Sequence, residues 1–182
     1  MKYLILNNIN GNIEQLNTVL DLQEDYDKTL ILGNIIGTKK QDSRKVLEIL
    51  FKMITSKMCE NFVCGVNDLN INDSKLPNGA KQWVRTFLPI TSFKIENKDI
   101  LLLTGTPDNP YNGNNVIDNN KYWNNDKDLD IIILGNNGSH NLVEKETQLI
   151  IYPGDLWDKN VIKYSILSIT ENNIKCEFKG VK

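Results

Sequence analysis

Leu4-Ile5-Leu6-Asn7-Asn8-Ile9-Asn10-Gly11-Asn12 joins a short aliphatic run to a helical pattern near the N-terminus. The run from Tyr3 to Leu6 is typical of a buried strand, because it is short and ends in turn-forming residues. Residues 13–22 carry apolar side chains at helical spacing, and Asn12 can cap this helix with Gln15 as its capping-box partner. The order of strand, tight loop and helix predicts an α/β unit. In such units, the loop at the carboxyl end of the strand usually holds the ligand.

The rest of the chain continues this alternation and then changes to hairpins. A helix at 44–56 between strands at 29–32 and 62–64 indicates a parallel sheet with right-handed crossovers. Later elements are expected as a helix at 79–88, a buried strand at 130–134, and strand pairs at 90–95 with 99–103, 142–145 with 148–151, and 163–169 with 174–178. Residues 108–125 are predicted to be the longest loop, either a flap over a site or a surface insertion.

Length and composition predict one globular domain that spans residues 1–182. A hydrophobic fraction of 40%, a charged fraction of 24% and a net charge of -2 give no reason to expect nucleic acid or a membrane as partner. No segment approaches the ~20 apolar residues that a membrane span needs. The cysteines Cys59, Cys64 and Cys176 lack the spacing of metal or redox sites, so we expect reduced thiols and a cytoplasmic protein.

The chain has a single histidine, His140. One histidine cannot build the multi-histidine sites that are common in hydrolytic metalloenzymes. His140 follows the glycine- and asparagine-rich segment at 135–138, so we expect an exposed loop residue there. A displaced metal ligand is the alternative.

Residues 7–12, Asn-Asn-Ile-Asn-Gly-Asn, resemble the Ser-Asp-Ile-His-Gly-Asn motif that opens the calcineurin-like metallophosphoesterases. Later segments resemble further motifs of this family in the same order: residues 33–34 (family Gly-Asp), 65–68 (Gly-Asn-His-Asp), 103–107 (an apolar strand ending in His-Gly-Ser-Pro), 135–138 (Gly-His-Thr-His) and 152–155 (Asn-Pro-Gly-Ser). The resemblance covers roughly residues 1–169 and is to the small bacterial-type phosphodiesterases and phosphatases.

This resemblance implies a four-layer α/β/β/α sandwich, in which two mixed β-sheets pack face to face with helices outside each. In the family, the loops place Asp, His and Asn side chains around two divalent metals, such as Mn, Fe, Ni or Zn. The metals activate a water molecule against a phosphate ester. One relative, the phosphoesterase-like subunit of the retromer, uses the fold for protein contacts.

Measured against the family motifs, this chain lacks the functional side chains. Asn8 stands at the first metal-binding aspartate, Asn10 at the first histidine and Asn34 at the aspartate that bridges both metals. Val66 stands at the ligand asparagine, and Asn67 at the histidine that serves the leaving group. An alternative register gives the ligand position to Asn67 without restoring a charge.

The three later ligand histidines of the family correspond to Thr104, Asn136 and Gly138. Two divalent cations held ~3.5–4 Å apart repel each other strongly, so they need anionic ligands between and around them. Without a metal, nothing lowers the pKa of the attacking water, and the Asn67 amide has no proton to give near neutral pH. We therefore predict no catalytic residues, no metal ligands and no cofactor, with a degenerate pocket at the replaced positions.

The predicted function is that of a catalytically inactive metallophosphoesterase homologue, a pseudoenzyme that acts as a binding or scaffold module. Its partner is expected to be an unidentified protein or a small phosphate-containing ligand. Two alternatives stay open: a weak metal-dependent phosphodiesterase or phosphatase, and a metal-free sensor of nucleotide or phosphate. The asparagines also have two explanations. Asn suits the tight turns of a decayed site, and its amide also suits a selected pocket for a neutral or anionic ligand.

Overall fold

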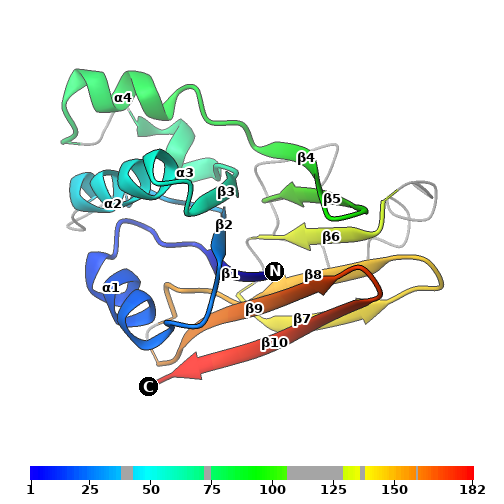
Figure 1. The fold of residues 1–182 in the computed structure, drawn as a ribbon. Coiled ribbons are helices and arrows are strands. Elements are labelled where there is room, and N and C mark those ends of the chain that lie inside the picture. Colours follow the sequence, from blue (N-terminus) through cyan, green and yellow to red (C-terminus); the bar gives the residue numbers. More distant parts are fainter. Residues whose placement is uncertain (38–42, 72–74, 106–128, 136–137, 159) are drawn as a thin grey trace.

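The computed structural model describes residues 1–37, 43–71, 75–105, 129–135, 138–158 and 160–182 (Figure 1). In chain order, its elements are β1 (Lys2–Asn7), α1 (Ile13–Leu22), β2 (Lys28–Leu32), α2 (Ser43–Thr55), β3 (Cys59–Phe62), α3 (Val66–Leu69), α4 (Asn78–Val84), β4 (Ile90–Ile95), β5 (Lys98–Leu103), β6 (Ile131–Leu134), β7 (His140–Glu144), β8 (Leu149–Pro153), β9 (Ile162–Thr170) and β10 (Asn173–Val181). No helix in this part of the chain is long and apolar enough to cross a membrane.

The strands form two five-stranded sheets, with the orders β10-β9-β1-β2-β3 and β4-β5-β6-β8-β7. In the first sheet β1, β2 and β3 run parallel, whereas β9 is antiparallel to both β1 and β10. In the second sheet β5, β6 and β8 run parallel, and the edge strands β4 and β7 are antiparallel to their neighbours. The prediction of two mixed sheets is therefore confirmed. Parallel pairing also brings the carboxyl ends of β1, β2 and β3 to one edge.

The side chains of β1 alternate between two hydrophobic cores. Tyr3 and Ile5 belong to the core between the sheets, which also contains Leu102 of the second sheet. Leu4 and Leu6 belong to the core under the helices. Neighbouring side chains of a strand point to opposite faces, so a strand that is covered on both faces is apolar throughout. This explains why the run at the N-terminus is aliphatic without interruption.

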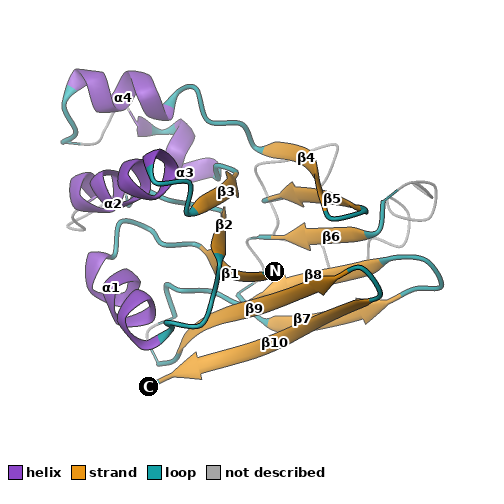
Figure 2. Cartoon of the chain, in the orientation of Figure 1, coloured by secondary structure: helices purple, strands orange, loops and turns teal. Residues whose placement is uncertain are grey.

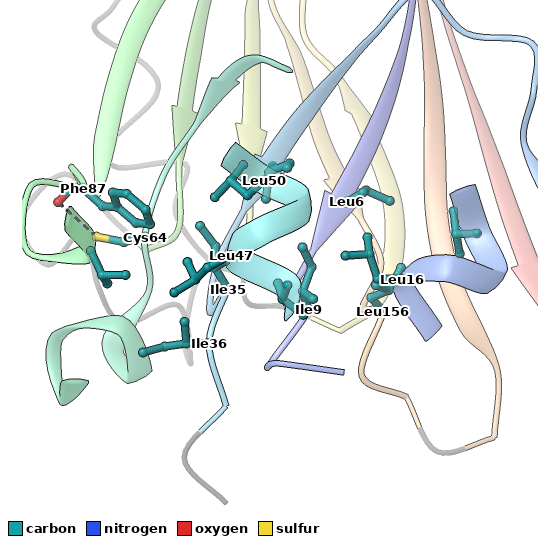
Figure 3. Close-up of a cluster of buried hydrophobic side chains, with 14 of the residues drawn as sticks. Leu6, Ile9, Leu16, Ile35, Ile36, Leu47, Leu50, Cys64, Phe87 and Leu156 are labelled. Carbon is teal, nitrogen blue, oxygen red and sulfur yellow. Dashed lines mark hydrogen bonds between the residues drawn. The ribbon is translucent and has the colours of Figure 1, made fainter. Parts of the chain in front are cut away.

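Helices cover the outer face of the first sheet (Figure 2). Leu16 of α1 and Leu50 of α2 belong to the same buried cluster as Leu6 of β1 (Figure 3). On the outer face of the second sheet, a separate buried cluster includes Leu134 and Tyr152, and the described residues place no helix there. The described residues therefore show three of the four expected layers: one layer of helices and two sheets.

The beginning of α1 follows from its capping residues. The Asn12 side chain accepts a hydrogen bond from the Gln15 backbone N–H at 3.1 Å and donates to the Gln15 side-chain oxygen at 2.6 Å. The first bond satisfies one of the N–H groups that the first turn of a helix leaves unpaired. The predicted bounds of this helix and its predicted cap are confirmed.

The third strand differs from its prediction. We predicted residues 62–64, whereas β3 is Cys59–Phe62. Cys64 is buried, but its backbone N–H donates to the Leu88 carbonyl at 2.9 Å instead of continuing the sheet. The apolar run therefore indicates that residues beyond the end of the strand are buried, and does not mark the bounds of the strand itself. The predicted long loop at 108–125 lies outside the described residues.

Asp68, in the short helix α3, connects two of the strand-end loops. The residue is 2% exposed, and its carboxylate accepts hydrogen bonds from the backbone N–H groups of Ile35 (3.0 Å), Ile36 (2.8 Å) and Gly65 (2.8 Å). Burial raises the pKa of Asp68 to about 7, although these N–H donors favour the ionised form. One carboxylate thus holds the loop after β2 against the loop after β3.

We expect Asp68→Asn to lower the free energy of unfolding by about 1–3 kcal/mol, because an amide NH₂ then faces backbone N–H donors that have lost an acceptor. The deficit should be smaller at pH 8 than at pH 5. Between pH 3.8 and about 7, the Asp68 carboxyl is more protonated in the folded protein than in the unfolded protein. The contribution of Asp68 to the free energy of unfolding therefore falls as the pH rises through this window. Chemical denaturation of both proteins at the two pH values measures this difference. A loss of stability in Asp68→Asn that grows with pH would contradict a raised pKa for Asp68.

Candidate functional site

The loops that follow β1, β2 and β3 meet at one edge of the first sheet. Backbone hydrogen bonds join the first two loops directly: the Asn10 N–H donates to the Asn34 carbonyl at 2.8 Å, and the Gly11 N–H to the Ile35 carbonyl at 2.9 Å. The resemblance implies that these loops surround one site, and the structure does bring them together. Asparagine side chains from three loops therefore come within contact of one another.

Four asparagine side chains form a series of hydrogen bonds, which we call the amide cluster: Asn8, Asn10, Asn34 and Asn67. The Asn34 Nδ2 donates to the Asn8 Oδ1 at 3.0 Å. The Asn34 Oδ1 accepts a hydrogen bond from the Asn67 backbone N–H at 2.7 Å. The Asn67 Nδ2 then donates to the Asn10 Oδ1 at 2.9 Å. Side chains that were predicted to line one pocket thus bind each other.

The side-chain oxygen of Asn8 is fully used within this cluster. It accepts hydrogen bonds from both the backbone N–H (3.1 Å) and the Nδ2 (3.0 Å) of Asn34. An amide oxygen has two lone pairs, so both are engaged. Asn8 and Asn34 are 4% and 6% exposed, and a buried polar group without a partner costs about 1–3 kcal/mol. Because the amides satisfy each other, the cluster needs no ion to offset this cost.

The backbone conformation also favours asparagine at two of these positions. Asn8 and Asn10 have φ angles of 53° and 51°, in the left-handed region. Outside glycine, asparagine is among the residues that adopt this region most readily. At positions 8 and 10, the amide side chain therefore suits the loop conformation as well as the cluster.

Glycines allow the loops to approach this closely. A Cβ at Gly33 would lie 2.6 Å from the Asn8 Oδ1, and one at Gly65 would lie 2.5 Å from the Asn34 Oδ1. Neither distance is compatible with an unshifted neighbour. These two glycines are among the residues that the chain shares with the family motifs, and their role is to make room for the side chains of the first two loops.

Asp155 brings a carboxylate to the cluster, which the sequence analysis did not anticipate. Its Oδ2 accepts a hydrogen bond from the Asn8 Nδ2 at 3.3 Å, and its Oδ1 accepts one from the Trp157 N–H at 2.9 Å. Burial raises the pKa of Asp155. The available signal was the position of Asp155 in residues 152–155, a segment that resembles a family motif. Asp155 is the one acidic residue of that segment, and it stands where the motif has Ser.

The remaining predicted pocket positions do not belong to the amide cluster. Thr104 is fully buried and donates to the Cys64 carbonyl at 2.8 Å, so its hydroxyl joins two strand ends. Val66 is 41% exposed at the start of α3. Gly138 lies at the rim, where an added Cβ would be 3.7 Å from the Asp155 Oδ2. Asn136 lies outside the described residues.

His140 is not the exposed loop residue that we predicted. It is the first residue of β7, it is half-buried, and its ring stacks on Phe178 with centroids 4.8 Å apart. A Cβ at Gly154 would lie 2.5 Å from the His140 Nε2, so this glycine makes room for the imidazole. Burial lowers the pKa of His140. Phe178 on β10 is distant from His140 in sequence, and no local sequence pattern predicts their contact.

The donor groups at this edge do not fit a centre of two divalent metals. Among the residues that the structure describes, no group of three or more His, Cys, Asp and Glu side chains could hold an ion. Asp155 supplies a carboxylate, but the amides of Asn8 and Asn34 carry no charge and cannot bridge as carboxylates do. Two cations placed here would lack the negative charge that offsets their mutual repulsion.

The close approach at Gly65 leads to a stability prediction. Gly65→Ala should lower the free energy of unfolding by about 1–3 kcal/mol, because the new methyl group collides with Asn34 in a packed region. The matched control is Gly79→Ala in α4, where nothing lies within 4 Å of the added Cβ. There, alanine should leave stability unchanged or raise it by up to about 1 kcal/mol. Equal losses in both variants, measured by urea denaturation, would refute the steric explanation.

Experimental structures of other proteins share this architecture. A metallophosphoesterase from Sphaerobacter thermophilus matches with a TM-score of 0.73 and 16% identity, over 100% of this chain and 89% of the other. A novel archaeal phosphodiesterase matches with a TM-score of 0.66 and 13% identity, over 98% and 100% of the two chains. Vps29 from Chaetomium thermophilum matches with a TM-score of 0.59 and 13% identity, over 100% and 95%.

At the level of sequence, no protein-family model and no curated protein matches this chain. The structural likeness extends over nearly the full length of each protein. Identities this low establish the fold and leave the activity to be argued from the site. The chain has the two-sheet α/β fold of the metallophosphoesterases.

Proposed function

We propose that this protein is a catalytically inactive metallophosphoesterase homologue that acts as a binding or scaffold module with a protein partner. The pairing of Asn8 with Asn34 carries the proposal. These residues stand where the resemblance implies a metal-binding and a bridging aspartate. Their side chains are buried and hydrogen-bonded to each other at 3.0 Å. A cation entering between them would break this bond and gain no anionic ligand from either side chain.

The chemistry of hydrolysis also lacks its proton donor. The resemblance implies a histidine for the leaving group at position 67, where this chain has asparagine. The Asn67 Nδ2 already donates to Asn10 at 2.9 Å, and an amide does not release a proton near neutral pH. Restoring hydrolysis would require new charges at several positions, because one substitution supplies neither the metal ligands nor the acid.

The fold by itself is compatible with a role other than hydrolysis. The similar structures include Vps29 proteins as well as a metallophosphoesterase and a phosphodiesterase. A fold can serve several functions, and the site decides among them. In this chain, the side chains at the strand ends favour the non-catalytic role.

One observation favours the enzymatic alternative. The Asp155 Oδ2 lies 3.3 Å from the Asn8 Nδ2. A flip of the Asn8 amide would therefore bring its oxygen next to this carboxylate oxygen. A carboxylate and an amide oxygen can both bind Mg or Mn. A single weakly held ion, with low phosphodiesterase or phosphatase activity, is therefore the competing function to test.

Titration calorimetry of the chelator-stripped protein should give no binding heat with Mn up to about 1 mM, a concentration that reveals sites with Kd near that value. Bis-p-nitrophenyl phosphate should not be hydrolysed under the same conditions. Asp155→Asn should behave like the unchanged protein in both measurements. Micromolar Mn binding that disappears in Asp155→Asn, together with metal-dependent turnover, would replace the proposal with the enzymatic alternative.

Inorganic phosphate and AMP should leave the Tm unchanged, because the Nδ2 groups of Asn8, Asn34 and Asn67 already donate to neighbouring side chains. A metal-free sensor predicts the opposite result, since a ligand that binds only the folded state raises the Tm with its concentration. Thermal denaturation without metal, at constant ionic strength set with sodium chloride, distinguishes the two. A phosphate-dependent rise in Tm that is lost in Asn67→Ala would support the sensor.

A further inference from the structure

A second surface, away from the amide cluster, has the features of a binding site. Helices α2 and α4 enclose a groove of about 360 Å³. Its apolar lining residues are Leu47, Phe51, Pro77, Ala80 and Trp83. This groove, which we call the α2–α4 groove, is therefore walled mainly by hydrocarbon and aromatic groups. Its size suits one or two side chains of a partner and excludes a large cofactor.

The aromatic wall of the groove is fixed from behind. Trp83 packs edge-on against Phe87, with ring centroids 5.1 Å apart and an interplanar angle of 87°. Phe87 is buried and packs in turn on Phe62 of β3, with centroids 4.7 Å apart. Packing against buried rings restricts the rotation of Trp83. A preformed wall lowers the entropy lost when a partner binds.

The front of the groove is open to solvent. Phe51 on α2 is 57% exposed, and its ring meets Trp83 edge-on with centroids 5.9 Å apart. Single exposed apolar residues are common on protein surfaces, but contiguous apolar surface often marks a binding site. Here the exposed ring continues into the apolar wall. Filling the groove would remove both rings from water.

The helices that border this apolar surface carry more basic than acidic residues, although the whole chain has a net charge of -2. Residues 43–57 and 75–85 contain one acidic residue, Glu48, which pairs with Arg44 at 2.9 Å. The basic residues in these two segments are Arg44, Lys45, Lys52, Lys57, Lys75, Lys81 and Arg85. Of these charged residues, Arg44, Glu48 and Lys52 line the groove, so Lys52 is the lining cation outside the Arg44–Glu48 pair. A partner with acidic groups beside an apolar anchor would match this distribution of charge.

We propose that the α2–α4 groove binds a peptide segment that carries an aromatic or large aliphatic anchor flanked by Asp and Glu. The anchor inserts between Phe51 and Trp83, and the acidic side chains face the basic rim. A peptide fits better than an anionic membrane, because Leu47 is buried and Trp83 is half-buried, so much of the apolar wall does not protrude. A membrane-binding surface presents protruding apolar groups to the lipid. The inference rests on the proposed function as a binding module and gives the chemistry of its partner.

Selection from a displayed library of random dodecapeptides on the intact protein tests the proposal. We expect the selected peptides to combine an aromatic or large aliphatic residue with several acidic residues. Synthetic copies labelled with fluorescein should bind in an anisotropy titration. Phe51→Ser and Lys52→Glu should each weaken binding about tenfold, since one removes anchor contacts and the other reverses a rim charge.

Two variants provide matched controls. Leu22→Ser removes a side chain on α1 that is 58% exposed, close to the 57% of Phe51. Lys94→Glu reverses an exposed charge on β4 of the second sheet. Neither should change the affinity for the peptide. Circular dichroism of all four variants establishes that the fold is intact, since the substituted positions lie on the surface.

Three outcomes would overturn the inference: no enriched peptides, enriched peptides without acidic residues, or binding that Phe51→Ser leaves unchanged. Binding to phosphatidylserine vesicles that depends on Phe51, without peptide selection, would assign the groove to a membrane instead. The outcome is separate from that of the proposed function. Metal-dependent turnover would refute the non-catalytic role without affecting peptide binding, whereas a failed selection would refute only the peptide.

Discussion

The arrangement of the loops after β2 and β3 depends on a buried carboxylate, that of Asp68. Three backbone N–H groups from two loops donate to it at 2.8–3.0 Å. Such a group is costly to bury, and these donors offset part of that cost. The consequence extends beyond α3. With the two loops held together, the Asn67 N–H reaches the Asn34 Oδ1, and Gly65 must remain without a side chain. The geometry of the amide cluster thus follows from a residue outside it.

The amide cluster shows how asparagine side chains can satisfy one another at a strand-end site. Carboxylates gathered at one point repel each other unless a cation lies between them. An amide of nearly the same shape both donates and accepts, so neighbouring side chains can satisfy each other. Asn8 and Asn34 do so at 3.0 Å. At positions where the resemblance implies charged metal ligands, the uncharged amides therefore fit the strand-end loops and satisfy each other.

The sequence predicted those features that depend on local pattern or on the order of motifs. The aliphatic run of β1, the Asn12 cap and the meeting of the three loops belong to this class, because each is encoded within a few residues or in the resemblance. Other features depend on contacts between distant segments. The stacking of His140 on Phe178 joins β7 to β10, and the bond from Asn8 to Asp155 spans most of the chain. Hydrophobic periodicity carries no information about such pairs, so these residues could be assigned only from the structure.

The amide cluster and the α2–α4 groove differ in what they offer a partner. In the cluster, the buried amides of Asn8 and Asn34 are already hydrogen-bonded, so a polar ligand would have to replace existing bonds and would gain little net free energy. In the groove, the exposed ring of Phe51 and the exposed side chain of Lys52 face water. Covering apolar surface contributes about 25 cal/mol per Å² before the costs of association. Surface that remains exposed can supply this energy, whereas groups that are already paired cannot. Binding is therefore favoured at the helical face of the first sheet, and the amide cluster serves to hold the strand-end loops in place.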